Sequence, residues 1–150
     1  MPKAKVRFYL RNKRRKIRLK KTDIRRLLCA ALSEDSSAKE WVVSVVIGTD
    51  AFLKRLNREY KGKDVATDVL SFLTEDPANL NARCVDVAVS ADRAIESAPQ
   101  YGNSADRELA LYILHGVLHA MGYEDSSPAL KEKMFKRQDE LMRRYWDERK

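Results

Sequence analysis

The sequence predicts an α+β fold, namely one domain over residues 1–150 in which a mixed sheet of about four or five strands packs against helices. Short apolar runs rich in β-branched residues alternate along the chain with longer segments in which apolar residues recur at helical spacing. A chain of 150 residues is long enough to bury one hydrophobic core without disulfide support. The elements are expected in the order β-β-α-β-α-β-β-α-α-α.

The first half of the chain is expected to begin with a β-hairpin, because residues 6–10 (VRFYL) and 16–20 (KIRLK) both alternate like strands. Thr22 can cap the helix that follows. The apolar stripe of that helix is Ile24, Leu27, Leu28, Ala31 and Leu32. Residues 41–47 (WVVSVVI) are almost wholly apolar, which is typical of a strand that helices cover on both faces. Asp50 can then cap a short helix.

The second half of the chain continues with two strands, at residues 69–73 and 84–90, and a short helix at 92–98. Ser104 can cap the helix that carries both histidines of the chain. The last helix is expected to begin at Ser127, a capping residue that is followed by proline at the first helical position.

The motif HGVLHAMGYED, at residues 115–125, predicts a metal site. Residues four apart on a helix lie one above the other, so the imidazoles of His115 and His119 can reach one ion. The apolar residues around the pair oppose the alternative that it merely covers a helix surface. Gly122 can end the helix, and Asp125 can then return toward the histidines. Three protein ligands leave a position for water, as in catalytic zinc sites.

Two other classes of metalloenzyme share part of this pattern. Zinc peptidases with an HExxH motif need a glutamate after the first histidine, and this chain has Gly116 there. Non-haem iron oxygenases also use two histidines and a carboxylate, but nothing else in the sequence indicates a cosubstrate pocket. Hydrolysis of a substrate other than a peptide is therefore favoured.

The net charge of +8 is concentrated at the N-terminus. Residues 1–26 hold thirteen Lys or Arg and one acid, for +12, and the remaining residues hold seventeen against twenty-one, for −4. This basic segment, which includes Arg14, Arg15 and Lys16, favours contact with RNA or the ribosome. The alternative is a charged face that is merely solvated.

The two cysteines, Cys29 and Cys84, lack CxxC spacing and are expected to be buried thiols in a reducing compartment. No apolar run is long enough to span a bilayer, and no apolar signal-peptide region follows the N-terminal charges. A cytoplasmic protein that does not bind a membrane is expected.

Two motifs resemble those of the YbeY family of bacterial endoribonucleases, and the resemblance covers nearly the whole chain. Residues 56–72 (LNREYKGKDVATDVLSF) resemble the family pattern LNxxYRxKDxxTDVLSF, and the histidine motif resembles HGxLHLxGYDH. Residues 85–90 (VDVAVS) and 132–142 (EKMFKRQDELM) resemble the family's GDIxIS strand and the helix that follows its metal motif.

The resemblance implies a zinc-bound hydrolase, with one ion per chain, that prefers single-stranded RNA. It also implies a role in the 3′-end maturation of 16S ribosomal RNA and in ribosome quality control. The implied partners are therefore single-stranded RNA, 16S rRNA and the small ribosomal subunit. The oligomeric state does not follow from the sequence.

Three positions depart from the family pattern. Asp125 stands at the third histidine, so zinc held by two neutral imidazoles and this carboxylate would carry a net charge of +1 instead of +2. A carboxylate also favours harder metals, which leaves another divalent ion open. Lys61 replaces an arginine, keeping a point charge for a phosphate but losing the bidentate geometry. Val85 replaces a glycine, which we interpret as a local packing change.

The resemblance also implies roles for single residues outside the metal motif. Lys61 would hold or neutralise the scissile phosphate, and Arg58 and Lys63 could bind neighbouring phosphates. The alternative for each is a solvated charge. Asp68 and Asp86 could accept a hydrogen bond from a metal-bound imidazole, or could serve as local structural residues.

Two alternatives to the endoribonuclease stay open at this point. One is a non-catalytic ribosome assembly factor with a structural metal, which the basic N-terminal segment would serve equally well. The other is a metallopeptidase, which the absence of the HExxH glutamate disfavours. Neither the RNA bond that is cut nor the general acid of the reaction follows from the sequence.

Overall fold

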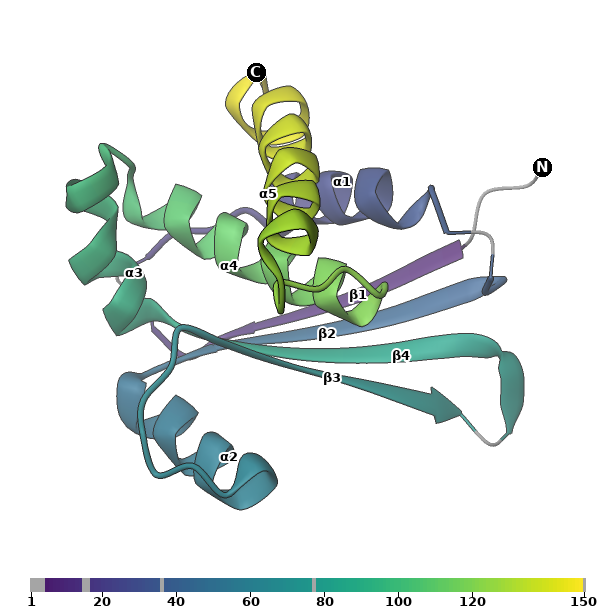
Figure 1. Ribbon diagram of the computed structural model, residues 1–150, viewed down its shortest axis with the longest axis horizontal. Helices are drawn as coiled ribbons and strands as arrows, with labels where there is room; N and C mark the ends of the chain where they lie inside the picture. Colours follow the sequence, from purple (N-terminus) through teal and green to yellow (C-terminus); the bar gives the residue numbers. More distant parts are fainter. Residues whose placement is uncertain (1–4, 15–16, 36, 77, 150) are drawn as a thin grey trace.

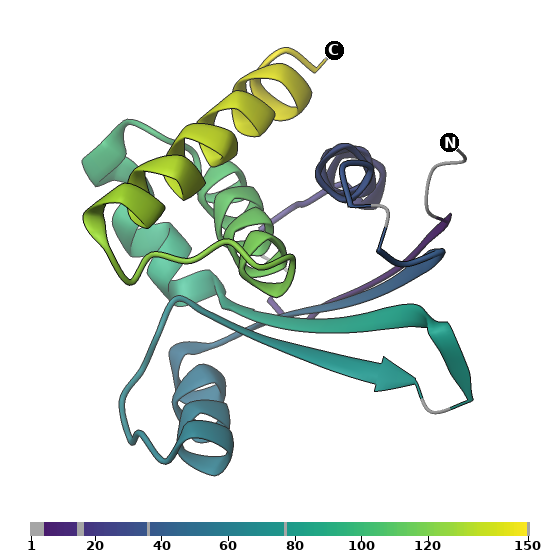
Figure 2. The ribbon, with the colours of Figure 1, turned by 45° about the vertical axis from the view of Figure 1, so that its right-hand side comes forward.

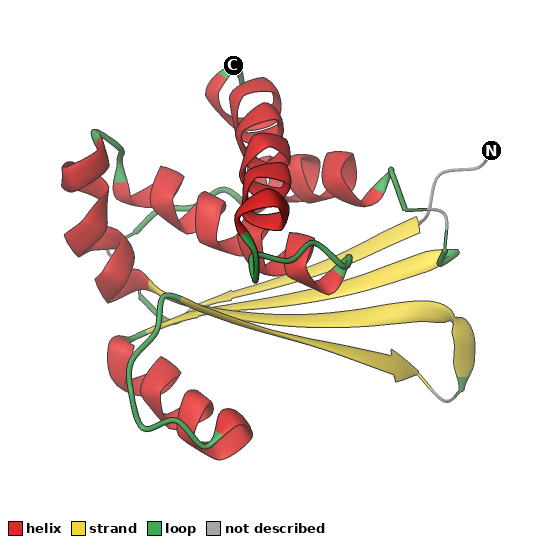
Figure 3. Ribbon diagram, viewed as in Figure 1, coloured by secondary structure: helices red, strands yellow, loops and turns green. Residues whose placement is uncertain are grey.

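The structure, a computed structural model, describes residues 5–14, 17–35, 37–76 and 78–149. It confirms the α+β class, with one four-stranded mixed sheet and five α-helices in the described part of the chain (Figure 3). The strands are β1 (Lys5–Asn12), β2 (Glu40–Gly48), β3 (Val69–Asp76) and β4 (Asn79–Ser90). The helices are α1 (Lys21–Leu32), α2 (Asp50–Lys61), α3 (Ala91–Ser97), α4 (Ala105–Ala120) and α5 (Pro128–Met142), with short turns η1 (Ala98–Tyr101) and η2 (Arg143–Asp147).

The sheet has the strand order β1-β2-β4-β3. β1, β2 and β4 run parallel to one another, whereas β3 runs antiparallel to β4. A short turn joins β3 to β4, but each parallel pair needs a crossover, which α1 supplies between β1 and β2. β1 and β3 are therefore the edge strands, and the C-terminal end of β4 pairs with the start of β3.

Helices cover the two faces of the sheet unequally (Figures 1 and 2). α1, α4 and α5 lie on one side of the sheet, and α2 lies alone on the other. The main core fills the first side, where Val43, Val45 and Ile47 of β2 are at most 1% exposed. On the α2 side the alternate residues of β2 stay half-buried, so the expected cover of this strand on both faces is only partial.

The expected N-terminal hairpin is wrong. Residues 17–20 form no strand, and β1 pairs with β2 instead. Ile17 is 6% exposed in the main core, and its carbonyl oxygen accepts a hydrogen bond of 2.9 Å from Asn12 Nδ2. Leu19 packs against the same core. The alternation therefore arises because two apolar residues anchor a loop on the core, and not because the segment is extended in a sheet.

The starts of the helices follow the sequence only in part. α1 begins without the expected side-chain cap from Thr22, and Thr49 caps α2 in place of Asp50. The caps expected for α4 and α5 are confirmed, since Ser104 and Ser127 each accept a hydrogen bond from a backbone N–H of the first turn. In the described part of the chain, every helix is too short or too polar to span a bilayer.

α4 approaches the sheet closely at Gly116. A Cβ atom at this position would lie 3.1 Å from a methyl carbon of Val87 and 3.2 Å from one of Val69. Because glycine has no side chain, the helix can settle onto β3 and β4 at this point. The neighbouring side chains of the helix are thereby held at the edge of the sheet that β3 forms.

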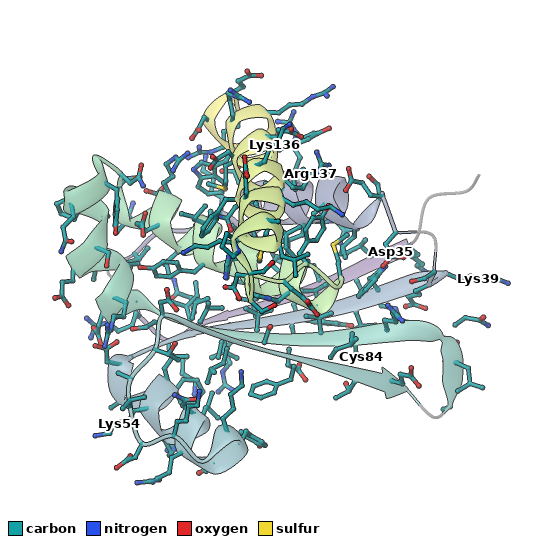
Figure 4. The ribbon with its side chains drawn as sticks, viewed as in Figure 1. Asp35, Lys39, Lys54, Cys84, Lys136 and Arg137 are labelled. Carbon is teal, nitrogen blue, oxygen red and sulfur yellow. The ribbon has the colours of Figure 1, made fainter. Side chains whose placement is uncertain are left out.

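α5 packs on α4 and is tied to the segment after α1 by an ion pair. Arg137, labelled in Figure 4, extends from α5 and pairs with Glu34, which directly follows α1. The same guanidinium donates to Glu140 of its own helix at 3.2 Å. Gln138, the residue after Arg137, contacts α4 through the ring of His115.

We expect Leu114→Ala to lower the free energy of unfolding by about 2–5 kcal/mol, because it leaves a cavity beneath α4. Leu114 is 0% exposed in the main core, whereas Leu80, at 83% exposed, offers a matched control. Urea unfolding followed by circular dichroism measures both variants. A loss no larger for Leu114→Ala than for Leu80→Ala would contradict the packing of α4 on the sheet.

Candidate metal centre

The side chains of His115, His119 and Asp125 converge at the C-terminal end of α4. Each offers a ligand atom, and these atoms all lie within 4.8 Å of one another. The Nε2 atoms of the two histidines are 3.0 Å apart, and His119 Nε2 is 3.6 Å from Asp125 Oδ2. The predicted chelate spacing and the predicted return of the carboxylate therefore occur together in the structure.

The turn after α4 brings the carboxylate back to the helix. Gly122 has φ +105°, a left-handed backbone that L side chains rarely adopt. The N–H of Tyr123 then donates to the carbonyl of Leu118 at 3.0 Å, which closes the turn in the manner of a helix C-cap. Asp125 follows two residues later, beside the last turn of the helix that carries the histidines.

Both imidazole rings are oriented by acceptors outside the cluster. His115 Nδ1 lies 2.9 Å from Oε1 of Gln138, and His119 Nδ1 lies 3.0 Å from the carbonyl oxygen of Tyr123. These oxygens can only accept, so the proton of each neutral ring sits on Nδ1 and the lone pair sits on Nε2. The two lone pairs consequently face the same point, as a metal site requires.

Sequence reasoning missed both of these acceptors. The Tyr123 contact is made by a backbone carbonyl and leaves no trace in the side-chain pattern. Gln138 did leave a signal, because it lies at helical spacing from Met134 and Leu141 on the buried face of α5. A glutamine that is 5% exposed on an apolar face needs a hydrogen-bond partner, and here that partner is His115.

Burial lowers the pKa of His115 from its ordinary value, and the nearby His119 lowers it further, while the hydrogen bond to Gln138 acts in the opposite direction. The neutral ring is therefore favoured around neutral pH. A neutral imidazole is the form that binds a metal, so the environment of His115 prepares it as a ligand.

A cavity of about 520 Å³ opens beside the three side chains. Lys61, Asp68 and Ser71 contribute to its walls, together with His115 and His119. The cluster can thus be reached from solvent between α4 and β3. A divalent ion held by two imidazoles and a carboxylate would keep open positions toward this cavity, so the donor set fits a catalytic metal site.

Lys61, the last residue of α2, reaches the cavity from the other side of β3. Gly62 follows in a left-handed conformation with φ +68° and ends the helix. Asn57, which is 4% exposed, fixes the connection after it by donating from Nδ2 to the carbonyl of Val65 at 3.0 Å. The predicted cation is therefore placed in the wall of the same cavity as the histidines.

The two predicted acidic partners of the imidazoles lie in different places. Asp68 lines the cavity, where its Oδ1 accepts from the N–H of Val69 at 2.8 Å. Asp86 lies in β4 on the face that α2 covers, and it lines a separate cavity with Ser44 and Phe72. The structure thus brings Asp68 near the cluster and does not bring Asp86 there.

The other predicted RNA-binding residues are more scattered. Arg58 lies 3.9 Å from Asp64 in an exposed ion pair, and Lys63 is exposed on the connection after α2. Arg14 pairs with Asp92 at 3.0 Å and is about one third exposed. None of these three lines the cavity. Arg15 and Lys16 lie outside the described residues.

The chain matches the model of the family Endoribonuclease YbeY over residues 9–146. The chain therefore belongs to the YbeY family of endoribonucleases. It is 35% identical to Endoribonuclease YbeY of Bacillus licheniformis over 132 residues, and this match covers 82% of this chain and 84% of that protein. It is 38% identical over 135 residues to the protein of the same name from Halalkalibacterium halodurans, covering 83% and 85%. Membership in the YbeY family implies an RNA substrate and hydrolysis.

The fold is also similar to the solution structure of TM1509 from Thermotoga maritima. The TM-score is 0.63 with 23% sequence identity, over 95% of this chain and 90% of the other. This likeness concerns the arrangement of sheet and helices, and it agrees with the fold class that the sequence predicts.

We expect the metal-free protein to lose stability as the pH falls below about 6.5, the ordinary pKa of histidine. Burial lowers the pKa of His115 in the folded state, so its contribution is fully present above that pH and is lost as the pH falls through the lower, folded value. Urea unfolding at pH 7.5, 6.5 and 5.5 measures the effect. The free energy of unfolding of His115→Gln should decline less steeply with falling pH. Parallel curves for the two proteins would show that His115 does not cause the decline.

Proposed function

We propose that the protein is a metal-dependent endoribonuclease that hydrolyses single-stranded RNA at the His115, His119 and Asp125 centre. Zinc is the proposed metal, with one ion per chain, and 16S ribosomal RNA in the cytoplasm is the proposed substrate. The proposed roles are 3′-end maturation of that RNA and ribosome quality control on the small subunit. The observation that supports the proposal best is the convergence of the three ligand atoms beside an open cavity that also contains Lys61.

A divalent ion bound at this centre supplies a Lewis acid to the phosphodiester. His115 and His119 present neutral Nε2 atoms, and Gln138 and the Tyr123 carbonyl hold the rings in that orientation. Asp125 contributes a negative charge, which reduces the net charge of the loaded site relative to three imidazoles. The affinity for phosphate then depends more strongly on cations supplied by the rest of the cavity.

Lys61 is the cation that the cavity supplies. Its ammonium group is proposed to lie against a non-bridging oxygen of the scissile phosphate and to stabilise the charge that develops there. Asn57 and Gly62 fix the end of α2, so the lysine is presented from an ordered helix terminus. The basic N-terminal segment, with Arg14 in its described part, is proposed to contact RNA or the ribosome further away.

The alternative of a non-catalytic ribosome assembly factor rests on Asp125 and Lys61, because both departures weaken the proposed catalytic centre. A metallopeptidase finds less support in the structure. The position after the first histidine is Gly116, which lies against Val87 and Val69 and offers no side chain that could activate water.

The metal ligands can be tested by metal analysis and RNA cleavage together. We expect His115→Ala or His119→Ala to empty the site, because two remaining ligands rarely hold zinc. Asp125→Ala should weaken metal retention against a chelator, and Asp125→His should strengthen it. Cleavage of a short single-stranded RNA should fall in parallel and should stop when wild-type protein is treated with chelator.

Full metal occupancy and activity of Asp125→Ala under chelator competition would remove Asp125 from the ligand set. Retained metal without any RNA cleavage by the wild-type protein would favour the assembly factor. A duplex RNA of the same sequence serves as the matched substrate, which a single-strand-preferring enzyme should cleave more slowly.

Lys61 can be tested by two substitutions with opposite expectations. Lys61→Ala should lower single-turnover cleavage by roughly ten- to a thousandfold, because it removes charge stabilisation in the transition state, while metal content and folding stay unchanged. Lys61→Arg should retain or improve activity, since a guanidinium adds bidentate phosphate geometry. Lys54→Ala, which changes an exposed lysine of the same helix outside the cavity wall, is the matched control. Full activity of Lys61→Ala would exclude the lysine from the mechanism.

A further inference from the structure

The open space at the metal centre continues past His115. A second cavity of about 630 Å³ lies on the other side of this histidine, walled by residues from η1, α4 and α5. Asp68, Val69, His115 and Asp125 line both cavities, so the two form one groove with the metal centre in the middle. The cavity that contains Lys61 is the first arm of this groove, and the cavity beside η1 and α5 is the second arm.

The second arm is bordered by two aromatic rings that solvent can reach. Tyr101, at the end of η1, is 72% exposed, and Phe135, on α5, is 38% exposed. The Phe135 ring lies over His115, with centroids 6.3 Å apart and planes inclined by 29°. Exposed rings that line a cavity are favourable surfaces for the planar faces of nucleobases.

The same arm contains polar side chains that are almost completely buried. Glu108 is 3% exposed, Gln138 is 5% exposed and Tyr112 is 9% exposed, and all three line the cavity. Oε1 of Glu108 accepts a hydrogen bond of 2.8 Å from Asn103 Nδ2. A carboxylate this deeply buried is rarely left without a cation, yet within the described residues no lysine or arginine forms an ion pair with it.

The nearest arginine in sequence is committed elsewhere. Arg107 donates to both carboxylate oxygens of Asp147, at 2.8 and 2.9 Å, and to Oδ1 of Asn103 at 3.2 Å. Glu108, which also accepts a hydrogen bond from the hydroxyl of Tyr112, thus presents a carboxyl group without a basic partner in the wall of a cavity that solvent can enter. Such a group is complementary to a ligand that carries N–H donors.

We propose that this second arm is a nucleobase subsite, which takes the base of a nucleotide flanking the scissile phosphate and favours guanine. The inference rests on the proposed function, since it places RNA across the metal centre. Guanine presents its N1–H and its N2 amino group side by side, and a carboxylate can accept from both. The other three bases offer a single donor group on their Watson–Crick edge, so the carboxylate discriminates against them.

The charges of the groove fix which part of the RNA lies in which arm. Asp68 and Asp125 line both arms, and the arms differ because the first adds Lys61 whereas the second adds Glu108 and Lys131. A phosphate is therefore favoured in the first arm, where no further carboxylate offsets the charge of Lys61. A single-stranded RNA can satisfy both arms, because its unstacked bases can turn away from the backbone and stack on aromatic side chains.

The subsite can be tested by binding of nuclease-resistant 2′-O-methyl hexamers to the full-length protein. The hexamers are oligouridine and a set in which one guanine, adenine or cytosine occupies each position in turn. Fluorescence anisotropy should show about three- to thirtyfold tighter binding when guanine occupies one particular position. Tyr101→Ala should weaken binding of that hexamer about five- to a hundredfold through lost stacking, and Glu108→Gln should remove the preference for guanine.

Tyr60→Ala is the matched control, because Tyr60 is also an exposed tyrosine, at 66%, but lies in α2 and lines neither arm. Tyr101→Ala alters an exposed ring, so it remains informative if Glu108→Gln does not fold. Equal affinity for all hexamers, or a guanine preference that survives both substitutions, would overturn the subsite. Cleavage of unmodified RNA by the wild-type protein is measured separately, so loss of the endoribonuclease proposal and loss of the subsite give different results.

Discussion

The close packing of α4 on the sheet is the constraint on which the site depends. Gly116 leaves no side chain between the helix and the methyl groups of Val87 and Val69, so the helix rests directly on β3 and β4. His115 and His119 flank this point on the helix and are consequently held at the edge of β3, where one side of each ring is buried and the other faces the groove. The core below α4, including Leu114 and Val117, keeps the helix in this position.

The same packing makes the candidate metal centre a product of three elements instead of one motif. α4 supplies both imidazoles, the turn at Gly122 supplies Asp125 and the Tyr123 carbonyl, and α5 supplies Gln138. Displacing α5 would free the His115 ring, since its Nδ1 contact comes from that helix alone among the described hydrogen bonds. The ion pair of Arg137 with Glu34 ties α5 to the segment after α1, and Glu140 of the same helix pairs with the same guanidinium.

Prediction from sequence succeeded where the signal was local. The spacing of the histidines, the glycine after them and the serine caps of α4 and α5 are contained within a few residues, and the structure confirms each. The hairpin failed because Ile17 and Leu19 alternate for a tertiary reason, namely their anchoring on a core built by other elements. The roles of Gln138 and the Tyr123 carbonyl could not be predicted, because the orientation of the imidazole rings depends on how α5 and the turn pack. The periodicity of apolar residues does not reveal this packing. Asp86 shows the same limit, since only the pairing of β4 with its neighbours determines which face of the sheet it occupies.

The site is built across the edge strand β3, and this arrangement explains how Lys61 and the histidines come to share one cavity. α2 lies below the sheet and α4 lies above it (Figure 1), so a residue of α2 can approach the histidines of α4 only around the edge of the sheet. The chain does so between Lys61 and Val69, where Gly62 ends the helix and Asn57 fixes the connection. The result is a groove that has Lys61 in the arm beside β3 and α2, has Glu108, Lys131 and two aromatic rings in the arm beside η1 and α5, and has Asp68 and Asp125 in both. In the proposed binding mode, the phosphates of an RNA would lie in the first arm beside Lys61 and an unstacked base would lie between the aromatic rings of the second.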